Sequence, residues 1–87
     1  NTFSTAVFPN PATETLNIQI FSPAPTAANL QLCDMMGRKL FERTIEVAGK
    51  HIEQWDVLNT FVPGVYRLSI HDDRENVSVH SVVLTKK

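Results

Sequence analysis

The residues best suited to metal chemistry are His71, Asp72 and His80, which flank a short polar segment late in the chain. Zinc accepts two histidines and a nearby carboxylate as ligands, and these histidines would face each other across a hairpin. Asp73 and Glu75 add two acids, but the segment lacks the glycine and the ligand spacing of a calcium loop. A solvated hairpin tip with two surface histidines accounts for these residues, so neither a metal nor any other cofactor is expected.

Nucleophilic catalysis has equally little support in the sequence. Cys33 is the single cysteine, and it follows Leu32 in an apolar stretch with no neighbouring base, which a cysteine nucleophile requires. We expect it to be a half-buried small hydrophobic side chain. One cysteine cannot close an internal disulfide, so the fold must depend on packing. No serine, histidine and carboxylate spacing suggests a catalytic triad, and the chain is predicted not to be an enzyme.

The largest aromatic side chains, Trp55 and Tyr66, allow two interpretations. Each can bury about 150–250 Å² in a core. A sugar-stacking platform is the alternative, and it requires aromatic rings that share an exposed face. Because Tyr66 alternates with Leu68 and Ile70, we expect it to point inward with them and both aromatic residues to pack in the core.

Alternation of apolar and polar residues with a period of two dominates the chain, as in Leu16, Ile18 and Ile20. This spacing, with turns between the runs, predicts an all-β fold, an antiparallel β-sandwich, in one domain spanning residues 1–87. About seven strands are expected, at residues 6–8, 16–20, 28–33, 39–47, 52–57, 66–70 and 77–84.

The segments between these strands carry turn-forming residues. Two prolines predict a loop at residues 22–26, and Gly49 predicts a turn at residues 48–50. Pro63-Gly64 suits the centre of a type II turn, with Gly64 at positive φ. A single helical turn is expected at residues 58–61. The last strand is expected to contain a bulge after His80, where its alternation slips.

The stretch LCDMMGRKL predicts a tight hairpin at residues 34–38. Gly37 supplies the left-handed residue that such a turn requires, and Asp34 accepts hydrogen bonds from the turn amides ahead of Arg38. Met35 and Met36 have two possible roles. They cover one end of the sandwich, since flexible thioethers fill irregular gaps, or they form a methionine-lined contact surface.

Length and charge exclude several classes of partner. The 87 residues carry a formal net charge of −1, which gives no electrostatic reason to expect a nucleic acid or an anionic membrane surface. No apolar run approaches the roughly 20 residues of a transmembrane helix, so direct membrane insertion is not expected. The chain begins Asn-Thr-Phe without an initiator methionine, and we expect it to be a segment of a longer secreted protein.

Four short pieces occur in a fixed order: FPNPATETLNI at residues 8–18, LCDMMGRKL at 32–40, PGVYRLSI at 63–70 and VVLTKK at 82–87. Together they resemble the C-terminal sorting domain, type A, of proteins exported by the type IX (Por) secretion system of Bacteroidetes. The likeness covers essentially the whole chain.

The resemblance implies a secretion signal with an immunoglobulin-like sandwich fold, read by protein partners. These partners are the outer-membrane type IX translocon, a cell-surface sortase and the upstream cargo domain of the same chain. The sortase would remove the signal and join the cargo to lipopolysaccharide, so the protein passes through the periplasm to the cell surface or the medium. The resemblance places the recognition determinants at Gly64, Tyr66, Val82, Val83, Lys86 and Lys87, and the motif turn at Asp34, Gly37 and Arg38.

The final strand has a physical means of being recognised. An edge strand at a chain end offers unpaired amides and carbonyls to a partner strand, and Lys86 and Lys87 add charge-steered encounter with an acidic surface. In the simpler interpretation, the lysines only keep an edge strand soluble. The alternative function is an immunoglobulin- or fibronectin-like accessory module that binds carbohydrate or protein.

Overall fold

Five antiparallel β-strands carry the fold in the computed structural model, which describes residues 3–57 and 60–85. Strand β2 lies at the centre, with β1 and β3 as neighbours, and β4 and β5 follow on the other side of its second half. No helix long and apolar enough to cross a membrane is found in the described residues. The strands are β1 (Ser4–Phe8), β2 (Thr15–Asp34), β3 (Lys39–Asp56), β4 (Gly64–His71) and β5 (Val77–Leu84).

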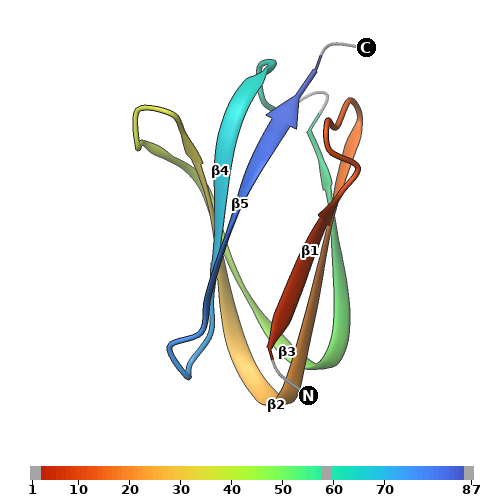
Figure 1. Ribbon diagram of the computed structural model, residues 1–87, viewed down its shortest axis with the longest axis vertical. Coiled ribbons are helices and arrows are strands. Elements are labelled where there is room, and N and C mark those ends of the chain that lie inside the picture. The colour runs from red at the N-terminus through yellow and green to blue at the C-terminus, as the bar shows by residue number, and fades with distance from the viewer. Residues whose placement is uncertain (1–2, 58–59, 86–87) are drawn as a thin grey trace.

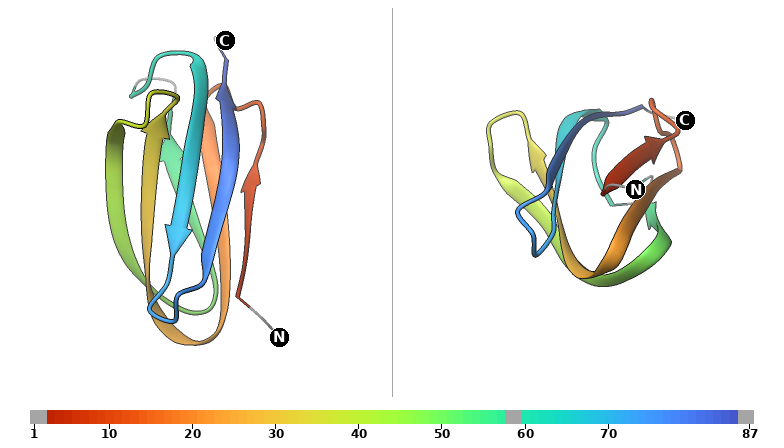
Figure 2. Two further views of the ribbon diagram at one scale, coloured as in Figure 1. Left: turned by 60° about the vertical axis from the view of Figure 1, so that its left-hand side comes forward. Right: turned by 60° about the horizontal axis from the view of Figure 1, so that its bottom comes forward.

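The two long strands, β2 and β3, each pass through both layers of a sandwich (Figures 1 and 2). Residues 15–22 of β2 pair with β1 and with residues 49–56 of β3. Residues 26–34 of β2 pair with residues 39–47 of β3 and with β4. The predicted antiparallel sandwich is therefore confirmed, but its strands are five continuous ones rather than seven separate ones.

The predicted loop at residues 22–26 and turn at residues 48–50 are wrong, because both segments lie inside strands. The pairing of β2 with β3 shifts register between Ser22 and Thr26, where Pro23 and Pro25 have no N–H to donate. Gly49, opposite Ser22, takes a φ of 76°. A bulge of this kind bends a strand without ending it, so the chain turns from one layer to the other while the pairing continues.

The core lies between the layers and consists of the inward side chains of the alternating strands. Tyr66 and Trp55 belong to it, at 5% and 8% exposed, so the prediction of core packing is confirmed for both. Phe41 meets the Trp55 ring edge-on, with 5.0 Å between ring centroids. The fully buried aliphatic side chains are Leu16, Ile18, Ile20, Leu30, Leu68, Ile70 and Val82.

Strand β5 differs from its prediction. Its pairing with β4 is continuous along its whole length, so the predicted bulge after His80 is absent from this described strand. The apparent slip has another cause. Val77 and Val79 point outward and are more than half exposed, while Ser78 and His80, which alternate with them, face the interior. Polar residues therefore fill the inward positions in the first half of this strand.

The two histidines beside the hairpin between β4 and β5, residues 72–76 (the second hairpin), do not face each other. His71 pairs with Val77, and His80 pairs with Leu68 three residues further along. His71 and His80 are both half-buried, so the prediction of a solvated pair is wrong. His80 has a partner in the strand beside it. Its Nε2 lies 2.7 Å from Thr5 Oγ1, which ties the two outer strands together, and burial lowers the pKa of His80. No three potential metal-ligand side chains gather within residues 3–57 and 60–85.

Two turn predictions change at the entry to β4. Gly64 is the first residue of β4 and its φ is not positive, so the predicted type II turn is wrong. In the predicted helical turn, Leu58 and Asn59 lie outside the described residues. The flanking residues form one hydrogen bond of helical spacing, from Phe61 N to Val57 O at 3.3 Å.

Candidate functional site

The hairpin between β2 and β3, residues 34–38 (the first hairpin), forms as predicted. The amide of Asp34 donates to the Arg38 carbonyl at 3.0 Å, and the amide of Gly37 donates to the Asp34 carbonyl at 3.1 Å. Asp34 Oδ1 accepts from the amides of Met36 and Arg38, at 2.9 and 3.0 Å. Gly37 adopts a φ of 87°, a conformation that side-chain-bearing residues rarely take.

The Asp34 carboxylate is held ionised by these contacts. The Arg38 amide lowers the pKa of Asp34, and the Arg38 side chain and the Met36 amide lower it further against a partial loss of hydration. In return, Asp34 Oδ2 accepts from Arg38 Nε at 2.9 Å. The carboxylate therefore closes the turn and also fixes the direction of the Arg38 guanidinium group. The Arg38 side chain is 78% exposed.

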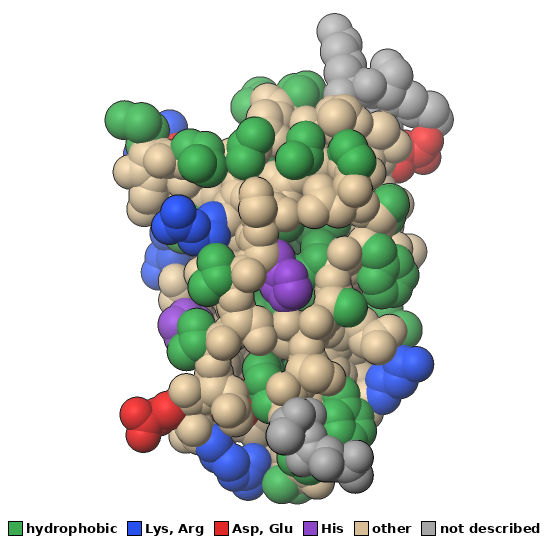
Figure 3. All heavy atoms as spheres, in the orientation of Figure 1, with side chains coloured by type: hydrophobic (Ala, Val, Ile, Leu, Met, Phe, Trp, Pro, Cys, Tyr) green, Lys and Arg blue, Asp and Glu red, His purple; other side chains and the backbone are tan. Residues whose placement is uncertain are grey.

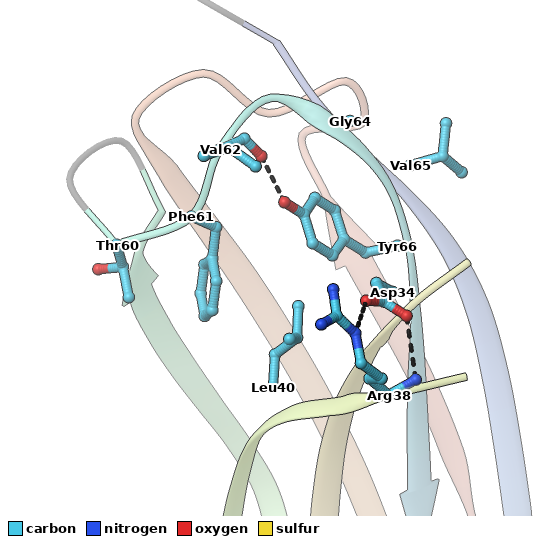
Figure 4. Close-up of a pocket in the computed structure, with 9 residues that line it drawn as sticks. All are labelled: Asp34, Arg38, Leu40, Thr60, Phe61, Val62, Gly64, Val65 and Tyr66. Carbon is cyan, nitrogen blue, oxygen red and sulfur yellow. Dashed lines mark hydrogen bonds and ion pairs between the residues drawn. The ribbon is translucent and has the colours of Figure 1, made fainter. Parts of the chain in front are cut away.

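A cavity of about 500 Å³ opens beside this hairpin, between it and the segment that enters β4 (Figure 4). It brings the motif residues Asp34 and Arg38 together with Gly64 and Tyr66, which are some 30 positions away in the sequence. The contact follows directly from the sheet, because Asp34 and Tyr66 are paired across β2 and β4. The cavity, here called the Arg38 pocket, is lined by Asp34, Arg38, Leu40, Thr60, Phe61, Val62, Gly64, Val65 and Tyr66.

Tyr66 forms both core and pocket wall. Its hydroxyl donates to the Val62 carbonyl, which holds the segment before β4 over the ring. Phe61 lies against the same ring, with 6.1 Å between centroids. Leu40 and Val62 are exposed at the rim. The pocket is therefore mostly apolar, with one charged pair at its side.

The methionines of the first hairpin do not cover the end of the sandwich. Met35 and Met36 are 63% and 85% exposed, so this expectation is wrong. The hairpin is closed by Asp34 and carries its methionines outward. Figure 3 shows hydrophobic side chains along this end of the molecule, and the other interpretation, a methionine-lined contact surface, stays a prediction.

The end of the terminal strand β5 is paired within the domain, a question that the sequence left open. Asn10 Nδ2 donates to the Ser81 carbonyl at 2.8 Å, and Asn10 Oδ1 accepts from the Val83 amide at 3.0 Å. The Ala12 amide donates to the Val83 carbonyl at 2.8 Å, and the Ala12 carbonyl accepts from the Thr85 amide at 2.9 Å. Asn10 and Ala12, in the Pro-Asn-Pro-Ala segment at residues 9–12, thus hold the end of β5 and are here called the clip.

The predicted determinants therefore fall into two places. Gly64 and Tyr66 lie together in the Arg38 pocket. Val82 is fully buried and Val83 half-buried on β5, where the clip holds the Val83 backbone. Lys86 and Lys87 lie outside the described residues. Cys33 is half-buried, as predicted.

Sequence reasoning assigned no role to Asn10, Ala12 or Phe61. The signal for the clip is the polar Asn10 between two prolines, which bring no amide hydrogen to pair. Its partner is more than 70 residues away, so the spacing could not identify it. Phe61 entered the sequence analysis only as the end of the expected helical turn, and its place in the pocket depends on the path of residues 60–62.

The family model described as the secretion system C-terminal sorting domain matches residues 6–85 of this chain. The match takes in both hairpins, the clip and the Arg38 pocket. The chain belongs to this family, the C-terminal sorting domains of type IX secretion. A comparison with curated proteins found no match.

Proposed function

We propose that this chain is the recognised tag of a secreted protein, carrying a cargo joined ahead of it across the outer membrane through the type IX translocon. The observation that carries the proposal is the family match over residues 6–85. A sorting domain of this family directs export to the cell surface or the extracellular space and is recognised by the type IX machinery. The protein passes through the periplasm on the way.

The later steps belong to partner proteins. A cell-surface sortase removes the tag, which forms one domain over residues 1–87, and joins the cargo to lipopolysaccharide. The bond cleavage is the sortase's chemistry, so the tag itself needs no catalytic group and acts only by being bound. A folded tag suits this role, because a fixed surface can be read by the translocon before the sortase acts.

Within the tag, Gly64 and Tyr66 are the residues we assign to recognition at the pocket, and Val82, Val83, Lys86 and Lys87 those at the terminal strand. The shared pocket of Gly64 and Tyr66 supports the first assignment. The clip on Val83 changes the second one: a partner strand that pairs with this part of β5 must first displace Asn10 and Ala12.

The carbohydrate-binding alternative has no supporting observation. It requires Trp55 and Tyr66 on an exposed face, and both are buried in the core. A protein-binding module remains compatible with the fold, and the sorting function is a specific case of it.

The test uses a fluorescent reporter with a periplasmic export signal, fused ahead of the 87 residues, in a bacterium with a working type IX system. We expect the fusion to reach the surface or the medium, and the reporter without the tag to stay in the periplasm. A tag lacking residues 82–87 should also fail. Retention of the complete fusion in the periplasm would refute the proposal.

A second variant separates recognition from folding, because removing residues 82–87 also removes the core residues Val82 and Leu84. Gly64→Ala is suited to this purpose. A methyl group at Gly64 would meet only Tyr66 Cε1, at 3.7 Å, and the φ of Gly64 suits any residue. The variant is expected to unfold like the unaltered tag, so any loss of export reports on the pocket surface.

A further inference from the structure

We propose that the Arg38 pocket binds an acidic peptide segment of a protein partner, with the Arg38 guanidinium as the anchor for its carboxylate. This inference rests on the proposed function, in that the partner is part of the machinery that reads the tag. It adds the chemistry of that partner, an Asp or Glu side chain flanked by apolar residues. Nothing in the family match names this chemistry.

The guanidinium group is oriented but not saturated. Asp34 Oδ2 accepts the Nε hydrogen, and the Arg38 side chain makes no other hydrogen bond or ion pair with the described residues. The two Nη atoms therefore remain as a planar pair of donors, which matches the two oxygens of a carboxylate. In Figure 4 the guanidinium points up the pocket toward Val62 and Tyr66.

The walls of the pocket select for apolar neighbours of that carboxylate. Phe61, Tyr66 and Leu40 line it, and Asp34 is the acid on that lining. Its volume of about 500 Å³ lies within the range of about 300–1,000 Å³ that is usual for ligand sites. A carboxylate with an aliphatic residue on either side fits this combination of one charged side and apolar walls.

Charge around the pocket favours an acidic occupant. The Asp34 carboxylate already accepts hydrogen bonds from two amides and from Arg38 Nε. It therefore competes little with a ligand carboxylate for the Nη donors of Arg38. Arg67 follows Tyr66 on β4 and pairs with Cys33 at the base of the first hairpin. The Arg67 side chain points to the opposite face of β4 from Tyr66 and lines a different hollow, so Arg38 is the cation on the lining of the Arg38 pocket.

The molecule itself supplies a control substitution. In the second hairpin, residues 72–76, Asn76 takes the place that Arg38 has in the first, and Asn76 Nδ2 donates to Asp72 Oδ2 at 2.8 Å. Arg38→Asn is therefore expected to keep the closing contact of the turn while removing both Nη donors. Arg38→Lys keeps the charge but loses the planar pair of donors.

The binding experiment uses the 87-residue chain and two probes, acetyl-Ser-Leu-Glu-Leu-Ser amide and the same peptide with Gln in place of Glu. Amide and Arg Nε resonances are followed by two-dimensional NMR during titration. We expect the Glu peptide to shift the Arg38 and Gly64 signals and to bind about tenfold tighter than the Gln peptide, as expected for a charge-assisted hydrogen-bonded pair. Arg38→Asn should remove that difference, and Arg38→Lys should reduce it.

Equal affinity for the two peptides, or an undiminished preference in Arg38→Asn, would overturn the inference. Inorganic phosphate is titrated separately. Tighter binding of phosphate than of the Glu peptide at Arg38 would also overturn it, in favour of a phosphate-bearing glycolipid. In the export assay, Arg38→Asn should leave the reporter in the periplasm although its NMR spectrum shows a folded tag.

The two proposals fail in different ways. If the complete fusion is exported and Arg38→Asn is exported equally well, the acidic-segment inference is wrong and the sorting function stands. If the complete fusion itself is retained, the sorting function fails, and a Glu-specific peptide response then shows only that the pocket binds carboxylates.

Discussion

The two hairpins at opposite ends of the sandwich close in the same way and present different side chains (Figure 1). In each, the amide of a leading aspartate donates to the carbonyl four residues on: Asp34 to Arg38 at 3.0 Å, Asp72 to Asn76 at 3.1 Å. In each, Oδ1 of that aspartate accepts the amides two and four residues on, and Oδ2 accepts the fifth side chain.

The difference lies in the fourth and fifth positions. The left-handed residue is Gly37 in the first hairpin and Glu75, at a φ of 65°, in the second. The fifth residue is a short, uncharged amide, Asn76, in the second hairpin, and its Nδ2 group donates to Asp72. In the first it is Arg38, which makes the corresponding contact and still has two donors left. The aspartate thus makes the turn, and the fifth residue decides what the turn presents.

The two hairpins also differ in how they are attached to the rest of the domain. The second hairpin is fastened to β2, where the Asp73 amide donates to Thr26 Oγ1 and Asp73 Oδ2 accepts the Ala27 amide, both at 3.0 Å. The first hairpin projects beyond the layers and stands beside the Arg38 pocket. The second hairpin is thus tied to the bend in β2, whereas the first borders the Arg38 pocket.

Exchanging the fifth residues should have the largest effect. Arg38→Asn is expected to reduce export of the reporter by about tenfold or more, since it removes a charge-assisted contact. Asn76→Arg places a guanidinium on the second hairpin, outside the Arg38 pocket, and should leave export unchanged. The measurement is the fluorescence ratio of medium and surface to periplasm. Similar losses from both exchanges would remove the distinction between the hairpins.

Substitution of the left-handed glycine is expected to weaken the first hairpin next most strongly. Gly37→Ala has open space around the new methyl group but forces alanine into a φ of 87°. We expect a loss of about 1–2 kcal/mol in the free energy of unfolding. Urea denaturation measures it. An unchanged midpoint would mean that the hairpin relaxes to another turn.

The closing aspartates should give matching pH dependences. Hydrogen bonds lower the pKa of both Asp34 and Asp72 from their usual value of 3.8, in Asp72 against an opposing effect of burial. Their stabilising contributions are therefore fully present above about pH 4 and are lost as the pH falls through the lowered folded-state pKa values.

Asp34→Asn and Asp72→Asn test this expectation. Each should melt at a lower temperature than the unaltered chain at pH 7, and the gap should close toward pH 2. Thermal melts followed by circular dichroism across this range measure it. A gap that is constant with pH would show that the carboxylate charge does not hold these turns.

The smallest effect is expected at Glu75. Replacing it with glycine relieves the left-handed strain of a side-chain-bearing residue, but adds flexibility to the unfolded chain. We expect Glu75→Gly to raise the free energy of unfolding by less than about 1 kcal/mol. Urea denaturation of Glu75→Gly and Gly37→Ala under the same conditions compares two changes in the free energy of unfolding that should have opposite signs. A destabilised Glu75→Gly would show that the glutamate side chain contributes to the second hairpin.

Local patterns in the sequence predict much of this fold. The period-two alternation gave the strands and their inward faces, and Asp34 with Gly37 gave the first hairpin, because each depends on residues a few positions apart. The bend of β2 was misjudged because Pro23 and Pro25 are typical of loops, whereas here the pairing continues on either side of them. His80 was misjudged because its partner, Thr5, belongs to the opposite end of the chain.

The candidate site was only partly predictable for the same reason. Gly64 and Tyr66 came from the family resemblance and Arg38 from the turn motif, but nothing in their spacing indicates one cavity. The pairing of β2 with β4 joins them. Asn10 and β5 meet through side-chain and backbone contacts between distant segments, which a single sequence does not reveal.

The direction in which β1 enters the sandwich has a consequence for whatever is joined ahead of it. Ser4 lies at the end with the strand bends and the second hairpin, whereas the first hairpin and the pocket lie at the other, in a molecule 37 Å long (Figure 1). A cargo protein attached ahead of Ser4 would lie at the end of the domain away from Arg38, and it would not overlap with a receptor bound at Arg38. Under the proposed function, this separation would let one receptor sort cargo proteins of different size and shape without a clash.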